Sequence, residues 1–102
     1  MFLSLLLILA DGPISKWEAK TPDLAYQSTA SIYDVERCLI DMPKQLVPVA
    51  FRQPDRPDEV TMIFPDQYGL SNGRVTLKKV SGGTAVTAWS MPKQRVEVCA
   101  PR

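Results

Sequence analysis

The sequence predicts a two-layer α+β domain, in which an antiparallel meander of about four strands carries one or two helices on one face. Three features lead to this fold class: one strongly amphipathic segment, two pairs of short alternating segments joined by turns, and two distant cysteines. The chain has 102 residues, of which 45% are hydrophobic and 23% are charged. This length and composition are typical of one globular domain.

The clearest predicted element is a helix over residues 31–42. Ser31 followed by Asp34 resembles a capping box, with Asp in place of the usual Glu or Gln. At about 100° per residue, the apolar side chains fall within a stripe about 120° wide; they are Ile32, Val35, Cys38, Leu39 and Met42. The helix is expected to end before Pro43, because a residue that precedes proline disfavours the helical conformation. We expect the stripe to be buried.

Residues 47–53 and 59–64 are predicted to form the first two strands. Val49 and Phe51 alternate with Ala50 and Arg52 in the first of them, and the second alternates in the same way. The intervening segment is rich in Pro and Asp and is typical of a turn. A proline at position 48 confines the first strand to an edge of the sheet or delays its start, because proline cannot donate to a ladder.

Residues 74–80 and 84–90 are predicted to form a second hairpin around Ser81-Gly82-Gly83. A three-residue loop places Val75 opposite Trp89 and sends Arg74, Thr76 and Lys78 to the other face. The face that carries Trp89 is the apolar one and is expected to be buried under the helix stripe. The predicted core therefore consists of Ile32, Val35, Leu39, Met42, Val75, Leu77 and Trp89.

The tail, residues 91–99, is compatible with two structures. Its valines favour a strand, whereas in a helix capped by Ser90 the apolar side chains and Cys99 share one arc. The direction in which Cys99 must point favours the helix, and we expect a short C-terminal helix.

The two cysteines, Cys38 and Cys99, are predicted to form a disulfide, with two buried thiols as the alternative. A loop of about 60 residues closed in this way stabilises a fold by about 4 kcal/mol in the chain-entropy model. A metal or redox role is not expected, since the chain has neither histidine nor a Cys-x-x-Cys pair.

The amino terminus predicts an exported protein. Residues 1–10 are almost entirely apolar but too short to span a membrane, which needs about 20 residues, so no integral membrane span is expected. We interpret them as a signal peptide cleaved after Ala10 or as a short uncleaved anchor, with a buried strand or helix as the alternative. Residues 11–30 are expected to be an irregular lead-in, and residues 31–102 the folded domain. The expected location is the periplasm or the exterior.

Several chemistries are excluded or disfavoured. The absence of histidine removes Ser-His-Asp and Cys-His catalysis, and a net charge of +1 supplies no strong field toward nucleic acid or anionic lipid. Asp55, Asp58 and Glu59 match no metal-binding loop and are interpreted as solvated turn residues. In the expected register Lys78 and Trp89 face opposite sides, which argues against a nucleic-acid surface. We predict no catalytic, cofactor-binding or metal-binding residues and no enzyme activity.

Two function classes remain. The preferred one is an exported non-enzymatic interaction or envelope accessory module that binds a protein partner. The alternative is a carrier that holds a small apolar ligand between helix and sheet. A solid core with an exposed apolar patch favours the first, and an internal cavity favours the second.

Overall fold

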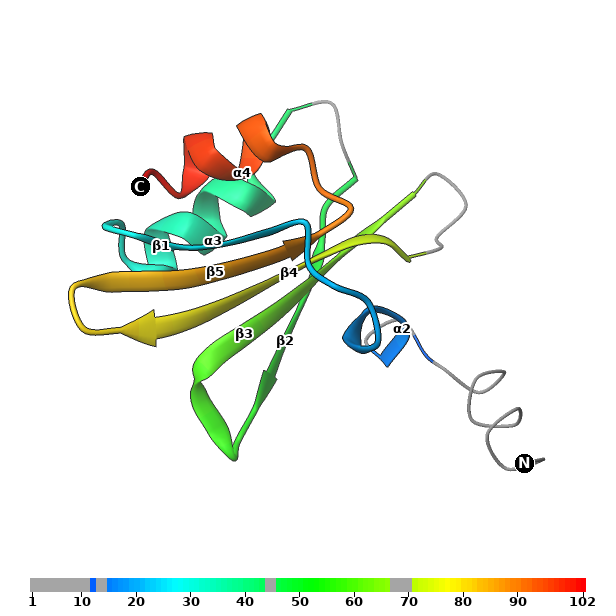
Figure 1. Ribbon diagram of the computed structural model, residues 1–102, viewed down its shortest axis with the longest axis horizontal. Helices are drawn as coiled ribbons and strands as arrows, with labels where there is room; N and C mark the ends of the chain where they lie inside the picture. The colour runs from blue at the N-terminus through cyan, green and yellow to red at the C-terminus, as the bar shows by residue number, and fades with distance from the viewer. Residues whose placement is uncertain (1–11, 13–14, 44–45, 67–70) are drawn as a thin grey trace.

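The computed structural model describes residues 12, 15–43, 46–66 and 71–102; the predicted signal peptide, residues 1–10, lies outside them. In this part of the chain an antiparallel five-stranded sheet has the order β1-β5-β4-β3-β2. The helices α3 and α4 lie side by side on one face, here called the helix face, and α2 lies near the opposite, outer face (Figure 1). The bounds are α2 Ser15–Glu18, β1 Leu24–Ser28, α3 Ile32–Ile40, β2 Val49–Gln53, β3 Arg56–Pro65, β4 Ser71–Val80, β5 Gly83–Trp89 and α4 Lys93–Cys99.

The two-layer α+β class is confirmed, and the strand count differs by one. Strand β1 lies in the segment that the sequence indicated would be irregular. It pairs with β5 from Leu24 opposite Ala88 to Ser28 opposite Thr84. This pairing provides hydrogen-bond partners for the backbone groups along an otherwise open edge of β5. The stabilisation comes from a distant strand, so the weak local pattern does not indicate it. The hydroxyl of Tyr26 donates to the carbonyl of Ala100 at 2.6 Å and so ties β1 to the end of α4.

The predicted amphipathic helix is confirmed as α3. The side chain of Ser31 accepts a hydrogen bond from the backbone N–H of Asp34 at 3.2 Å, as a capping residue does. The structure buries Ile32, Val35 and Leu39 and leaves Met42 partly buried against the core. The capped first turn therefore fixes which stripe of the helix meets the sheet.

The tail forms a helix, α4, and the disulfide joins it to α3. Cys38 and Cys99 are bonded, with their Cα atoms 5.3 Å apart. The predicted cap is wrong: Pro92 precedes the helix, and the backbone N–H of Ser90 instead donates to Asp23 at 2.6 Å. The valines do not impose a strand because burial of one side of α4 outweighs their intrinsic propensity.

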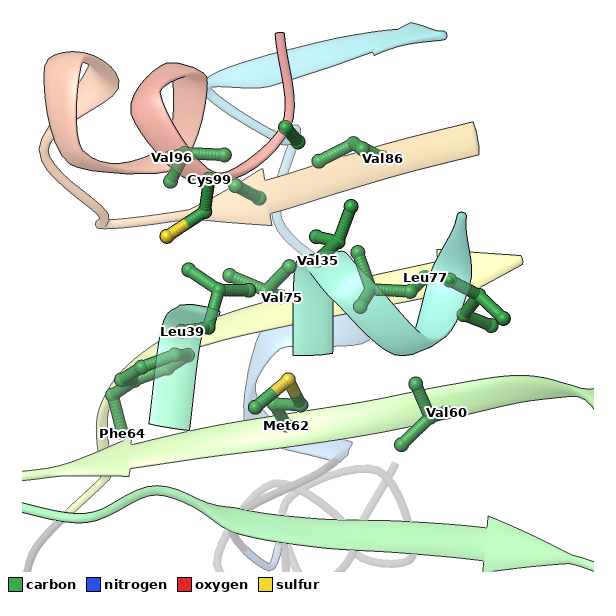
Figure 2. Close-up of a cluster of buried hydrophobic side chains, with 13 residues drawn as sticks. Val35, Leu39, Val60, Met62, Phe64, Val75, Leu77, Val86, Val96 and Cys99 are labelled. Carbon is green, nitrogen blue, oxygen red and sulfur yellow. The ribbon is translucent and has the colours of Figure 1, made fainter. Parts of the chain in front are cut away.

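The core lies between the helix face and the two helices (Figure 2). Strands β3, β4 and β5 contribute alternate side chains to it, from the face that the helices cover. The side chains that are at most 1% exposed include Val35, Leu39, Val60, Met62, Val75, Leu77, Val86 and Val96.

The register of the β4–β5 hairpin differs from the predicted one by one residue. Val80 pairs with Gly83, so the loop has two residues and Gly82 takes the left-handed conformation with φ 83°. Arg74 rather than Val75 lies opposite Trp89. Because side chains alternate with a period of two, this slip moves every predicted β5 side chain to the other face. The expected core position of Trp89 is therefore wrong.

Candidate interaction surface

Exposed apolar side chains gather around strand β2. Among the described residues, seven large apolar side chains are exposed. One of them, Val98, projects from α4. The other six come from β2, from the residues just before it and from α3; we call them the edge surface: Tyr33, Ile40, Leu46, Val47, Val49 and Phe51. Apolar surface concentrated in one region is typical of a binding site rather than of scattered solvent-facing residues.

Strand β2 is the outermost strand of the sheet at this end. It pairs with β3 on one side, and all five of its residues are exposed. The position agrees with the edge predicted from Pro48, which is itself buried. The pairing with β3 is interrupted between Phe51 and Gln53, which shortens the regular part of the strand. An edge strand of this kind presents backbone donors and acceptors to its surroundings.

A shallow depression lies between α3 and β2. Arg52 forms an ion pair with Glu36 of α3, and this contact links the helix to the edge strand. Tyr33, Arg37 and Ile40 of the helix line the depression together with Arg52. Tyr33 is 69% exposed, so its ring contributes free surface rather than core packing. The edge strand is therefore flanked by aromatic and apolar side chains on the helix face and by Phe51 on the outer face.

The outer face is partly covered by the segment that contains α2. Trp17 is buried there, with the ammonium groups of Lys16 and Lys20 each 4.8 Å from its ring centroid. The indole N–H of Trp89 donates to the carbonyl of Lys20 at 2.9 Å, and the guanidinium of Arg74 lies 4.7 Å from its ring. Trp89 thus fastens the amino-terminal segment to the sheet and has no place in the main core.

This position lowers the expected effect of removing the Trp89 side chain. Trp89→Ala should reduce the free energy of unfolding by about 1–2 kcal/mol, below the 3–5 kcal/mol of a buried aromatic. Urea denaturation measures the change, with Trp17→Ala as the buried comparison. In a Trp17→Phe background, iodide should quench the emission of Trp89 to an intermediate degree. A loss of unfolding free energy above 3 kcal/mol, together with unquenched, blue-shifted emission, would support the predicted three-residue loop instead.

A second apolar depression lies beside α4. Met42 and Pro43 line it together with Arg95 and Val98 of the helix. It resembles the edge surface in character but contains no strand edge, so it offers side-chain contacts alone. Val98, at 77% exposure, is a matched control position for the edge surface.

The charged side chains that the sequence suggested as possible sites do not come together in the structure. Asp55 and Asp58 are exposed, and no group of three metal-ligating side chains occurs in the described residues. Lys78 shares the outer face with Trp89, contrary to the expected register, but it pairs with Ala85, four residues along β5. That spacing is about 13 Å, which still separates the charge from the ring.

Comparison of the chain with models of protein families, with curated proteins and with solved structures finds no match. None of the helices that the structure describes is long and apolar enough to cross a membrane.

Sequence reasoning located the edge strand but missed the surface around it. Pro48 indicated an edge strand or a delayed start, and β2, which begins at Val49, shows both. Nothing local indicates that Tyr33 faces away from the core stripe toward β2, because the partner of that helix face is set by tertiary packing. Trp17 was expected as a possible anchor of the amino-terminal segment onto the domain, and it is buried. The position of Arg74 against Trp89 was missed, because it depends on the register of the β4–β5 hairpin.

Proposed function

We propose that this chain is an exported, non-enzymatic interaction module that binds an extended segment of a protein partner along β2. One observation carries the proposal: six of the seven exposed large apolar side chains in the described part of the chain belong to the edge surface. Apolar side chains there would be covered on binding, and the backbone of β2 supplies a second, directional set of contacts.

The arrangement suits a strand rather than a helix as the bound element. A strand added to β2 would form main-chain hydrogen bonds, and its side chains would alternate between the two faces. One set would lie over Val49 and Phe51 on the outer face. The other set would enter the depression that Tyr33 and Ile40 line beside α3. Apolar residues at every second position of the partner segment are therefore expected.

The carrier hypothesis has less support. Five depressions described at the surface are not lined by Val35, Leu39 or Met62. These three side chains are fully buried between helix and sheet, where a carried ligand would have to lie.

The proposal is tested by comparative capture from the exporting cell. Immobilised wild-type protein should retain a partner that Phe51→Lys fails to retain, because a lysine on an edge strand opposes strand addition. Val98→Lys places the same charge on the exposed apolar site of α4 and should retain the partner. Equal retention by both variants would contradict the proposal, as would loss with Val98→Lys alone.

Export is supported by the Cys38–Cys99 disulfide, since such bonds persist in oxidising compartments. Protein recovered from outside the cytoplasm of the producing cell should have the intact mass of a chain that begins at Asp11. A chain that accumulates in the cytosol with Met1 retained and both thiols reduced would refute export.

A further inference from the structure

The chain itself contains a segment with the pattern that a partner of β2 is expected to have. Val47, Val49 and Phe51 occur at every second position, and all three are exposed. The strand β2, which contains the last two of them, is the outermost strand at its end of the described sheet. The same few residues therefore supply both an open strand edge and the alternating apolar side chains that such an edge binds.

Pairing with β3 fixes the face on which each side chain of β2 lies. Ala50 is paired with Met62, which is buried in the core, so Ala50 lies on the helix face. Val49 and Phe51 precede and follow Ala50, and they therefore lie on the outer face. A second strand that adds to this edge would place its own side chains on the same two faces.

We propose that the partner is a second copy of this chain, whose β2 adds antiparallel to this β2 about a two-fold axis through Ala50. The inference rests on the proposed function and names the partner of the same surface. A two-fold contact joins the same patch of both copies, so the patch must be complementary to itself. An axis at Ala50, perpendicular to the sheet, meets this condition because it places Val49 of each copy opposite Phe51 of the other.

The strand itself selects Ala50 as the axis. The paired residues, 49–51, form the regular part of β2, before the irregularity that follows Phe51. Alanine has the smallest side chain in the strand, so two copies fit opposite each other. Pro48 lies beyond the paired residues, where its missing N–H costs no hydrogen bond. The two pairs of Val49 with Phe51 join a β-branched and an aromatic side chain, a combination that stabilises antiparallel ladders.

The charges near the edge are compatible with this register. Arg52 keeps its ion pair with Glu36 of the same copy, because strand addition uses the backbone of β2. In the proposed register Arg52 lies opposite Pro48 of the other copy, four positions from the second Arg52. Four positions span about 13 Å, more than the screening length of about 10 Å at 0.1 M salt. An axis at Phe51 would halve this separation and bring the two cations together.

The two α3 helices lie on the same side of the joined sheet and have room there. In each copy α3 lies over β4, so β3 and β2 separate it from the contact. Five strand spacings place the two helices roughly 24 Å apart, well beyond the 8–10 Å of packed helices. The contact is therefore confined to the two strands, and the interface belongs to the small class below about 1,200 Å². Such a dimer exchanges with the monomer and forms at high concentration.

Sedimentation velocity from micromolar to millimolar concentration tests the self-association. The wild-type protein, with its disulfide formed, should shift from monomer toward dimer as the concentration rises. Phe51→Lys should stay monomeric, because it places a charge in both cross-strand pairs and on an edge strand. Val98→Lys, which places the same charge on the exposed site of α4, should dimerise as the wild type does. A wild-type monomer at every concentration, undiminished dimers of Phe51→Lys, or a loss of dimers in Val98→Lys would overturn the proposal.

Single cysteines introduced into β2 test the register. Ala50→Cys should form a disulfide-linked dimer under oxidising conditions, since residues that face each other across an antiparallel ladder have Cα atoms about 4.5–5.5 Å apart. Gln53→Cys, on the same strand, should stay unlinked, because its two copies would lie about 20 Å apart. Linkage through Gln53→Cys, or none through Ala50→Cys, would contradict the pairing about Ala50.

The inference and the proposed function fail in different ways. If the wild type stays monomeric but Phe51→Lys still loses a captured protein, β2 binds a different partner and only the second copy is ruled out. If the wild type stays monomeric and capture is also insensitive to Phe51→Lys, both the inference and the proposed function are wrong. Dimers that depend on Phe51 and link through Ala50→Cys would support both.

Discussion

Replacement of Cys99 by alanine is expected to lower the free energy of unfolding by about 2–5 kcal/mol. The disulfide joins residues 61 positions apart and holds α4 against α3. Without it, the unfolded chain regains the entropy of a large open loop. The folded state also loses the sulfur of Cys99, a residue that is 5% exposed and belongs to the core cluster.

Urea denaturation of oxidised protein measures this loss. The double variant Cys38→Ala/Cys99→Ala should be destabilised to a similar extent, because each variant removes the same bond. Val98→Ala alters the neighbouring exposed position and should change stability by less than about 0.5 kcal/mol. A loss below 1 kcal/mol in both cysteine variants would mean that the packing of α4, and not the covalent link, maintains this end of the fold.

Gly83→Ala is expected to destabilise the protein by about 3 kcal/mol, the upper end of the usual cost of overpacking. A Cβ atom at position 83 would overlap the carbonyl oxygen of Ser28 and approach the Cα of Thr29 to 3.2 Å. Both neighbours are backbone atoms, so β1 itself would have to move away from β5. That movement would also disturb the carboxyl terminus, where Ser28 donates through its hydroxyl to the carbonyl of Pro101 at 2.6 Å.

The adjacent glycine provides the control. Gly82 has open space around the position of a Cβ and a φ of 83°. Gly82→Asn should therefore cost little, since asparagine tolerates the left-handed conformation better than other residues. Thermal or urea unfolding should separate the two variants by about 2 kcal/mol or more. Equal losses would show that the turn conformation matters and the close approach of β1 does not.

The elements with strong local signals were predictable from the sequence. Ser31, the apolar stripe of α3 and the stop before Pro43 define that helix through contacts within about one turn. The disulfide followed from two cysteines, one of which lies on a buried stripe. Pro48 indicated that the adjacent strand lies at an edge or starts late, because the missing N–H is a property of the residue itself, and β2 begins directly after it at Val49.

The predictions that failed concern parts of the fold that depend on interactions between distant segments. From the sequence, the loop at Ser81-Gly82 could have two or three residues. The loop length depends on which β5 side chains pack into the core. Val86 and Ala88 fit under the helices, and Trp89 is accommodated on the outer face by Arg74 and the carbonyl of Lys20. The strand β1 forms because β5 offers an edge, which no pattern within residues 24–28 indicates.

The candidate site likewise combines features that the sequence predicts with features that depend on distant contacts. The sequence indicates that β2 lies at an edge, but the side chains that surround this edge come from α3 and from a segment with no regular structure. Packing of α3 on the sheet places Tyr33 beside the depression that Arg52 lines, whereas pairing with Thr61 of β3 sends Phe51 to the outer face. Their exposure, which carries the functional proposal, is a property of the folded surface.

The most direct test of the edge surface is site-specific photocrosslinking in the cell that produces the protein. A photoreactive phenylalanine analogue placed at position 51 should form an adduct with a protein partner, because that side chain lies on the strand to which the partner is proposed to add. The same analogue at position 98, on the exposed apolar site of α4, should form none. An adduct at position 98 alone, or at neither position in folded, disulfide-bonded protein, would contradict binding along β2.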